Sequence, residues 1–438
     1  MLDILNSKRS SLLVDLNNTL VYASLLFEEG FVMTWEFIER KEAFDYIGLS
    51  NTSVNEIEQF LHGRVRLSAT LFSNKKLYLS RQSLIMLASL NEYDQKQVVK
   101  EMYFLSSNPS TPSVVRHKRN PLLRIFRTRY PFKNYHYLLT CILRDGKVVI
   151  HDIAFDRQLH GKSIFKHSHQ RTQMYHVKKE TGKNGEYNGV QNNDEAKLLL
   201  AEWDHTKAQV THQVNTLHAT VNGMLNDYEK AATLMGVHTQ VAYKEDKPTE
   251  YTLFHNPSDN AKLDLIECVY DKTRFTSHNA QHLAAVMKQC AEQGKQVKWT
   301  VHSQGAIIFN SALEYVRKKN PSLKLLNQQV VVHAGGANTT KIGKNAQQLG
   351  LKINYNKTRT NPFDIVPNIA ARQTPLSASS LVRCCKFLGL VMNGEVTESP
   401  HTLPYFGVES YRRQLMMSGT NMASKRLKDI DAYLKNKS

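Results

Sequence analysis

The stretch VKWTVHSQGAIIF, residues 297–309, decides how the C-terminal half of the chain is interpreted. Its first six residues have the apolar and β-branched character of a buried strand, and the residues after Ser303 have the apolar spacing of a helix. A residue between such a strand and helix is thrust out at the carboxyl end of the sheet, where open α/β sheets bind ligands. The free N–H groups of the helix's first turn lie at the same place. Ser303 is therefore a candidate nucleophile, and Gly305 supplies the small residue that so tight a crossing needs.

Strands and helices alternate on both sides of this stretch. The pattern predicts strands at residues 251–254, 296–302, 329–333 and 351–355, and helices at 276–292, at 305–318 and ending at 349. Helices of this length between strands indicate βαβ units, and the continuous runs VKWTV and QVVV suit strands covered on both faces. The sequence thus predicts an α/β fold for residues 246–438, with a mostly parallel sheet flanked by helices.

The residues around Ser303 resemble a known motif. His302-Ser303-Gln304-Gly305 is similar to the nucleophile elbow of lipases and other α/β-hydrolases, whose pattern is G-x-S-x-G. Val301 stands where that pattern has its first glycine, so the turn has to accommodate a valine. The resemblance implies a serine hydrolase of the compact class 3 lipase type, in which one helix separates the oxyanion strand from the nucleophile strand.

Two later loops resemble those that complete this family's site. NPFDIVP, residues 361–367, is similar to the D-x-V-P loop that bears the acid, which indicates Asp364. SPHTLPY, residues 399–405, is similar to the late loop that bears the histidine, which indicates His401. The order Ser, Asp, His is the one expected of this fold. The resemblance covers about residues 246–407, with a hairpin near residues 135–155 as an added antiparallel edge.

Acyl-transfer chemistry gives each residue a role. His401 would take the proton of the Ser303 hydroxyl and return it to the leaving alkoxide, while Asp364 holds the imidazole tautomer and stabilises the imidazolium. Each residue also has a plain structural alternative: an N-cap for Ser303, a turn residue for Asp364 and a surface loop position for His401. Asp259 and Asp271 are the alternative acids.

The tetrahedral oxyanion needs preorganised donors, and the loss of one typically costs ~3 kcal/mol. The backbone N–H of Gln304, directly after the nucleophile, is the first candidate. The second is expected from HNPS, residues 255–258, after the preceding strand. Because Pro257 has no N–H, Asn256 and Ser258 are the candidates there.

No cofactor or metal is expected. His167, His169 and His176 lie in a polar segment at residues 160–193, and their spacing matches no common metal motif. His302 and His333 are expected to be structural.

The rest of the chain predicts three further parts. Residues 1–133 have no assigned role, and residues 134–193 combine a hairpin around Asp145-Gly146 with the polar segment. Residues 194–245 predict a long helix and a linker, because apolar residues recur at spacings of four and three between 210 and 235. Two interpretations of residues 194–235 stay open: an oligomerisation arm, or an amphipathic helix docked on its own chain.

The net charge of +18 concerns partners rather than fold. It suits peripheral contact with an anionic membrane surface, and nucleic acid is a less favoured partner. The five cysteines show no CxxC spacing and suggest reduced thiols. The N-terminal residues do not resemble a signal peptide, so we expect a cytoplasmic protein, or an effector or phage protein delivered by another route.

Two functions follow from these observations. The first is hydrolysis of a carboxylic ester in a lipid or small molecule, by a lipase-, phospholipase- or esterase-like enzyme. The second is a non-enzymatic interaction or virion protein with a degenerate hydrolase scaffold, which Val301 favours and which would bind anionic partners through its basic surface.

Overall fold

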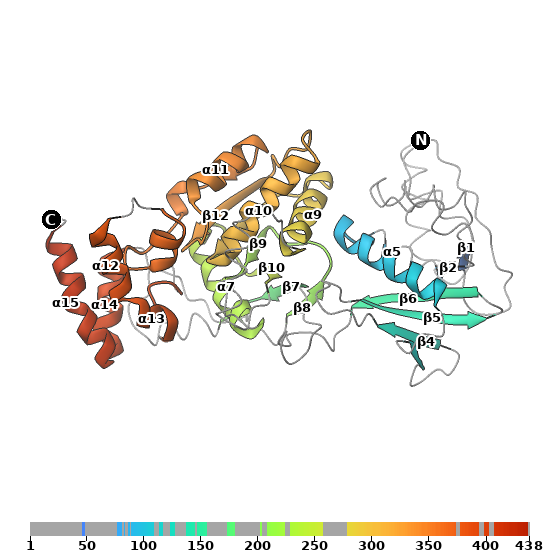
Figure 1. The fold of residues 1–438 in the computed structure, drawn as a ribbon, viewed down its shortest axis with the longest axis horizontal. Helices are drawn as coiled ribbons and strands as arrows, with labels where there is room; N and C mark the ends of the chain where they lie inside the picture. The colour runs from blue at the N-terminus through green and yellow to red at the C-terminus, as the bar shows by residue number, and fades with distance from the viewer. Residues whose placement is uncertain are drawn as a thin grey trace. The chain divides into compact units, whose positions relative to one another are not determined.

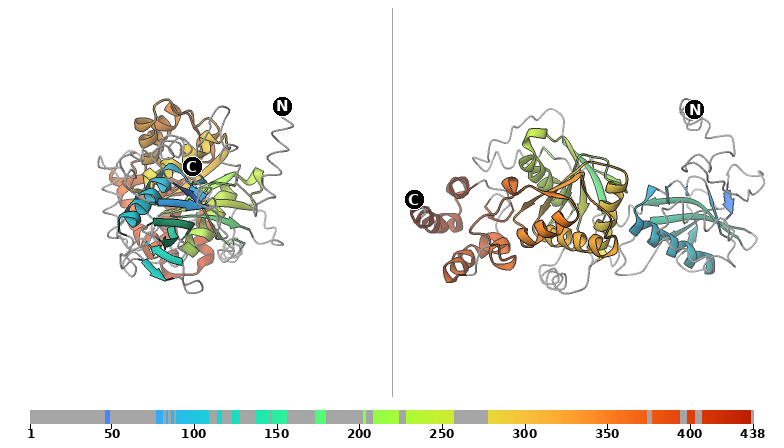
Figure 2. Two further views of the ribbon diagram at one scale, coloured as in Figure 1. Left: turned by 90° about the vertical axis from the view of Figure 1, so that its right-hand side faces the viewer. Right: turned by 90° about the horizontal axis from the view of Figure 1, so that it is seen from above.

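The structure is a computed structural model (Figures 1 and 2). It describes residues 46–48, 77–80, 83, 86–87, 89–108, 114–116, 123–127, 137–144, 147–155, 173–179, 202–203, 208–223, 228–256, 278–373, 377–393, 398–402 and 407–436. The chain divides into two compact units: Met1–Tyr130 with Tyr135–Gln158, and Pro131–Asn134 with Leu159–Ser438.

The first unit contains a six-stranded sheet with the order β1-β2-β6-β5-β4-β3. Its strands are β1 (Tyr46–Gly48), β2 (Leu77–Ser80), β3 (Val114–Arg116), β4 (Leu123–Arg127), β5 (Tyr137–Arg144) and β6 (Lys147–Phe155). Helix α5 (Glu92–Ser107) lies beside β6 (Figure 1), and the side chain of Asn91 caps its first turn. The predicted hairpin is confirmed as β5 and β6, which pair antiparallel. It belongs to this sheet, so the expectation that it extends the sheet of residues 246–438 is wrong.

The second unit contains a seven-stranded sheet with the order β13-β12-β11-β9-β10-β7-β8. Its strands are β7 (Gln173–Lys178), β8 (Gln209–Thr211), β9 (His218–Val221), β10 (Glu250–His255), β11 (Val297–His302), β12 (Gln328–His333) and β13 (Lys352–Ile353). The five strands from β13 to β10 are parallel, and β7 and β8 form an antiparallel edge. The prediction of a mostly parallel sheet is confirmed.

Eight helices are described in this unit, and some of them cover the two faces of the sheet. They are α7 (Tyr228–Ala242), α9 (His278–Glu292), α10 (Gln304–Lys319), α11 (Thr339–Gln348), α12 (Ala378–Lys386), α13 (Leu388–Asn393), α14 (Val408–Ser418) and α15 (Asn421–Lys435). Single turns occur at η4 (Lys244–Asp246), η5 (Tyr355–Lys357) and η6 (Val366–Ala370).

Each face of the sheet has its own core because side chains alternate along a strand. Trp299 and Val301 of β11 pack with residues of α9, α10 and α11. Tyr251 and Leu253 of β10 belong to the core of the other face, with residues of α7 and of the C-terminal helices α13 to α15. The end of β11 that bears the elbow is therefore held by packing from both sides.

The predicted long helix at residues 194–235 is wrong. The chain forms β8 and β9 there, and α7 begins only at Tyr228. The region is rich in valine and threonine, which favour strands, and all four residues of β9 are buried, so no two-residue alternation distinguishes it from a helix. The polar segment at 160–193 likewise contains β7, in which Tyr175 and Val177 are buried and His176 lies 2.9 Å from the Glu250 carboxylate.

Candidate active site

Ser303 occupies the turn between β11 and α10, as the sequence predicts. Its backbone has φ 53° and ψ −125°, a conformation that residues other than glycine rarely adopt. Backbone strain of this kind costs about 1–3 kcal/mol and persists where the surroundings fix it. Here the Ser303 N–H donates to the carbonyl of His333 at 3.3 Å, and the Ser303 carbonyl accepts from Gly336 N–H at 2.8 Å. The turn is thus held from the neighbouring strand.

Glycine is required where α10 crosses the end of β9. A Cβ on Gly305 would lie 2.4 Å from the carbonyl oxygen of Val221 and 2.8 Å from that of Asn222. Both are backbone atoms, which cannot relieve the clash by changing rotamer. Val301, by contrast, is an interior residue of β11 with its side chain fully buried among the helices of one face. The valine in place of the pattern's first glycine is therefore compatible with the elbow.

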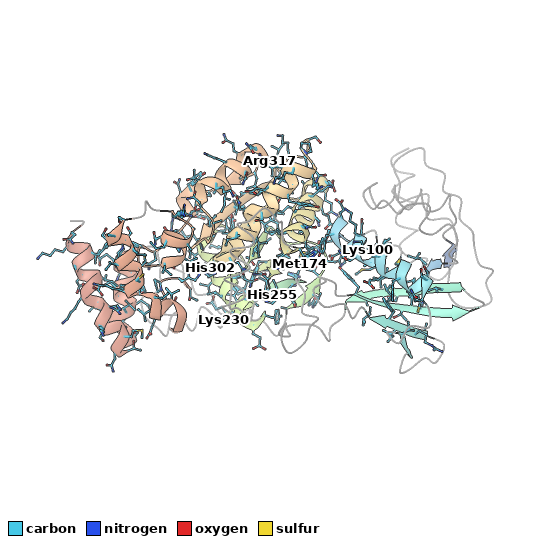
Figure 3. The ribbon with its side chains drawn as sticks, viewed as in Figure 1. Lys100, Met174, Lys230, His255, His302 and Arg317 are labelled. Atoms are coloured by element: carbon cyan, nitrogen blue, oxygen red, sulfur yellow. The ribbon has the colours of Figure 1, made fainter. Side chains whose placement is uncertain are left out.

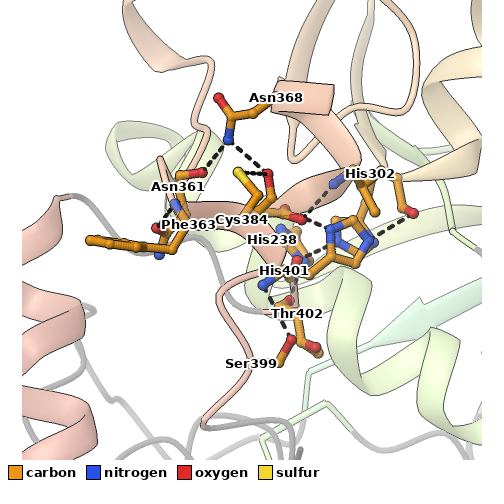
Figure 4. A network of polar contacts seen from close by, with 12 residues as sticks. His238, His302, Asn361, Phe363, Asn368, Cys384, Ser399, His401 and Thr402 are labelled. Carbon is orange, nitrogen blue, oxygen red and sulfur yellow. Dashed lines mark hydrogen bonds and ion pairs between the residues drawn. The ribbon is translucent and has the colours of Figure 1, made fainter. Parts of the chain in front are cut away.

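The three residues singled out in the sequence meet at this elbow. His401 Nε2 lies 2.8 Å from Ser303 Oγ, and His401 Nδ1 lies 2.7 Å from Asp364 Oδ2 (Figure 4). With the proton on Nδ1 the imidazole donates to the carboxylate and leaves Nε2 free to accept the serine proton. The chain thus joins a hydroxyl, an imidazole and a carboxylate in one line of hydrogen bonds.

The Asp364 carboxylate is fully buried and oriented by its own loop. Its second oxygen accepts from Val366 N–H at 3.0 Å. The Asn368 side chain donates to the backbone carbonyls of Asn361 and Asp364, both at 2.7 Å, and so closes the loop on itself (Figure 4). The NPFDIVP sequence therefore forms a compact structure in which one carboxylate oxygen is left for His401.

Buried histidines fasten the loop that bears His401. His302 Nε2 lies 2.9 Å from the backbone carbonyl of His401, and His238 Nε2 lies 2.9 Å from that of Thr402. His238 also meets His333, with 2.9 Å between their Nδ1 atoms. Burial holds the pKa values of His238 and His302 well below the usual range and lowers that of His333 to about 3. From the sequence, His302 and His333 were expected to be structural. No role was predicted for His238, because it follows shortly after the helix wrongly predicted at residues 194–235.

A comparison with known families agrees with this geometry. The family model described as "Alpha/beta hydrolase of unknown function (DUF900)" matches residues 203–363. The C-terminal part of the chain contains an α/β-hydrolase domain. The match contains the elbow of this hydrolase and ends one residue before Asp364. No curated protein and no solved structure matches the chain.

The second oxyanion donor was predicted at Asn256 or Ser258, and the contacts of Asn256 do not favour it. The N–H of Asn256 donates to the Asn222 side chain at 2.7 Å, so it is already engaged, and Ser258 lies outside the described residues. Asn256 instead links the end of β10 to the start of α10, since its side chain donates to Gln304 Oε1 at 2.8 Å. Gln304 opens α10, where N–H groups have no intrahelical acceptor, and its backbone N–H stays the predicted first donor.

Asn256 was chosen because β9 was not predicted from the sequence. The strand beside β11 in the hydrolase sheet is β9, not β10. Among the described residues, one α-helix, α9, lies between β10 and β11 in sequence, and α7, β10 and α9 lie between β9 and β11. The loop after β9 reaches the nucleophile: a Cβ on Gly223 would lie 3.0 Å from Ser303 Oγ. The sequence does contain a signal for this strand and its loop, because the turn-forming pair Asn222-Gly223 follows a β-branched run.

The structure describes few of the remaining candidates. Asp259 and Asp271 lie outside the described residues, as do His167 and His169. His255, at the end of β10, packs against Tyr175 (His255 is labelled in Figure 3). Across the described part of the chain no group of three His, Cys, Asp or Glu residues is arranged to hold a metal ion. None of the described helices has both the length and the apolar character needed to cross a membrane.

Proposed function

We propose that the hydrolase domain cleaves a carboxylic ester through an acyl-enzyme formed on Ser303. The hydrogen-bonded line from Ser303 through His401 to the buried Asp364 carries this proposal. The geometry suits general-base activation of the serine, because the base lies within direct hydrogen-bonding distance and its tautomer is fixed by the carboxylate.

The reaction has two halves. In the first, His401 accepts the Ser303 proton as Oγ attacks the ester carbonyl, and the same proton passes to the alkoxide as the C–O bond breaks. In the second, water loses a proton to His401 and attacks the acyl-serine, which releases the acid and restores the hydroxyl. The Gln304 N–H and a donor from the loop at Gly223 would bind the oxyanion in both halves.

The substrate is proposed to be an ester with an anionic or membrane-bound portion. The support for this is the net charge of +18, which favours anionic partners in general and names none of them. A panel of p-nitrophenyl esters of increasing chain length, followed by phospholipids in neutral and anionic vesicles, would locate the preference.

Labelling with a fluorophosphonate probe tests the proposal, because such probes react only with an activated serine. The wild-type protein is expected to be labelled at Ser303 and to hydrolyse at least one ester of the panel. Ser303→Ala should abolish labelling and reduce turnover by about 10⁶-fold. Ser311→Ala is the matched control, since Ser311 is also buried and lies in α10, the helix that follows Ser303. An unlabelled wild-type protein that hydrolyses no ester would favour the non-enzymatic alternative.

A further inference from the structure

We infer that His302 and His238 are positioning residues that hold the backbone of the His401 loop by donating to two consecutive carbonyls, those of His401 and Thr402. The inference rests on the proposed function, because it assigns these residues to the placement of its base. The two histidines come from β11 and α7, elements far apart in sequence from the loop at residues 398–402.

The contacts of His302 fix its protonation. A carbonyl can only accept, so the nitrogen 2.9 Å from the His401 carbonyl has to carry the proton, and His302 is the Nε2–H tautomer. Its other nitrogen, Nδ1, is buried and has no hydrogen-bond partner among the described residues. A second proton there would place an unpaired charge in the interior, which is costly, and burial lowers the pKa of this histidine accordingly.

The contact distances order the protons of His238 and His333. One proton lies between their Nδ1 atoms, which are 2.9 Å apart, so with both rings neutral only one of the two Nε2 atoms can donate to its carbonyl. The contact of His238 Nε2 with the Thr402 carbonyl is the shorter one, at 2.9 Å, so we assign the proton to His238 Nε2, and the bare Nδ1 of His238 accepts from Nδ1–H of His333. Nε2 of His333 then carries no proton, like Nδ1 of His238, and it faces the Lys357 carbonyl with no hydrogen between the two atoms. This is the longest of the four contacts, at 3.3 Å, as expected of two acceptors. The protons thus all point towards the His401 loop.

The rings of His302 and His238 also lie close to the ring of the base, with tilted planes. The centroid of the His302 ring lies 4.9 Å from that of His401 and 4.5 Å from that of His238 (Figure 4). The His302 ring limits the space around the His401 imidazole, while the two carbonyl contacts set the position of the loop backbone. Because His302 and His238 are neutral, the proton taken from Ser303 goes to His401.

Paired substitutions separate this role from plain packing. His302→Phe and His238→Phe keep an aromatic ring but remove the donor, whereas His302→Gln and His238→Gln keep an N–H near the position of Nε2. The phenylalanine variants are expected to lose about 10- to 100-fold in kcat, the scale of a small misplacement of a reacting group, with KM changed less than twofold. The glutamine variants should recover most of that loss. His282→Phe, a buried histidine of α9 on the other face, is the control and should keep wild-type kcat.

A spectroscopic measurement tests the anchoring without activity. Long-range ¹⁵N–¹H correlation of the imidazole rings in the full-length protein at pH 7 should report Nε2–H for both His302 and His238. A proton on Nδ1 of either ring would overturn the inference, as would phenylalanine variants with wild-type kcat or losses that glutamine does not recover. A wild-type protein that is not labelled by the fluorophosphonate and hydrolyses no ester would overturn the proposed function together with the inference. Failure of the inference alone leaves the labelling and the hydrolysis of the wild type intact.

Discussion

The buried histidines make the stability of the hydrolase domain depend on pH in a calculable way. The pKa of His333 is lowered from 6.5 to about 3, so below pH 6.5 the unfolded chain binds a proton that the folded domain does not. The free energy of unfolding therefore contains a contribution that is complete above pH 6.5 and is lost as pH falls towards 3. The loss is about 1.4 kcal/mol per pH unit once the unfolded residue is protonated, or about 2 kcal/mol between pH 8 and pH 5. His238 and His302 act in the same direction.

His333→Phe isolates one such contribution. Denaturant unfolding at pH 8, 7, 6 and 5 would be followed by the fluorescence of Trp203 and Trp299, both buried in this unit, in a Trp35→Phe background. The variant is less stable at pH 8 because His238 loses its donor, but its free energy of unfolding should fall by about 2 kcal/mol less than that of the wild type between pH 8 and pH 5. The titration of carboxylates changes the free energy of unfolding of both proteins equally, so it cancels when their pH dependences are subtracted.

The refuting result is an equal pH dependence in the two proteins. It would mean that His333 shares an additional proton with His238 in the folded domain, so that the pair is a buried cation already at neutral pH. A proton on each outer nitrogen and one between the rings would then satisfy the carbonyls of both Thr402 and Lys357. The order of protons inferred for the His401 loop would be wrong in that case.

Three further predictions concern the hydrolase site and its surroundings. Gly305→Ala should destabilise the domain by about 1–3 kcal/mol, the cost of overpacking, because its Cβ would press on backbone atoms; thermal unfolding measures this, and an unchanged midpoint would contradict the close crossing. Asp364→Asn should leave the fold intact but reduce kcat by about 10⁴-fold, since the amide favours the wrong tautomer of His401; a variant as active as the wild type would remove Asp364 from the mechanism. In a background without Cys268, a thiol reagent should modify one cysteine of the native protein, the exposed Cys385. Its neighbour Cys384 should stay unreacted, because burial raises the pKa of this thiol to about 11. Two fast-reacting thiols would refute this prediction.

The sequence predicted most of the hydrolase sheet because local signals agreed there. The strands now seen as β10, β11 and β12 were predicted within one residue at each end, and so was the helix after the elbow. The predicted last strand is only two residues long, β13, and passes into a 3₁₀ turn at Tyr355. Runs of valine between polar turns are typical of parallel strands, whose two faces are both covered.

One local ambiguity produced the main errors. Apolar residues of β8, β9 and the segment between them recur at spacings of four and three, which imitates a helix, and the true alternation is lost where a strand is buried on both faces. With β9 unrecognised, β10 became the apparent neighbour of the nucleophile strand, and Asn256 became an oxyanion donor. Only the order of strands in the sheet brings Gly223 beside Ser303.

The sequence by itself determined that Ser303 stands at a strand-to-helix turn, and which acid and histidine loops follow it. Those features depend on neighbouring residues along the chain and are visible as short motifs. Tertiary structure alone decided which strand lies beside the elbow, and that His238, His302 and His333 form a buried cluster in contact with the loop of the base. The reason is physical: strand order and side-chain contacts arise from packing between segments up to 164 residues apart, as for His238 and Thr402, and no local pattern encodes them.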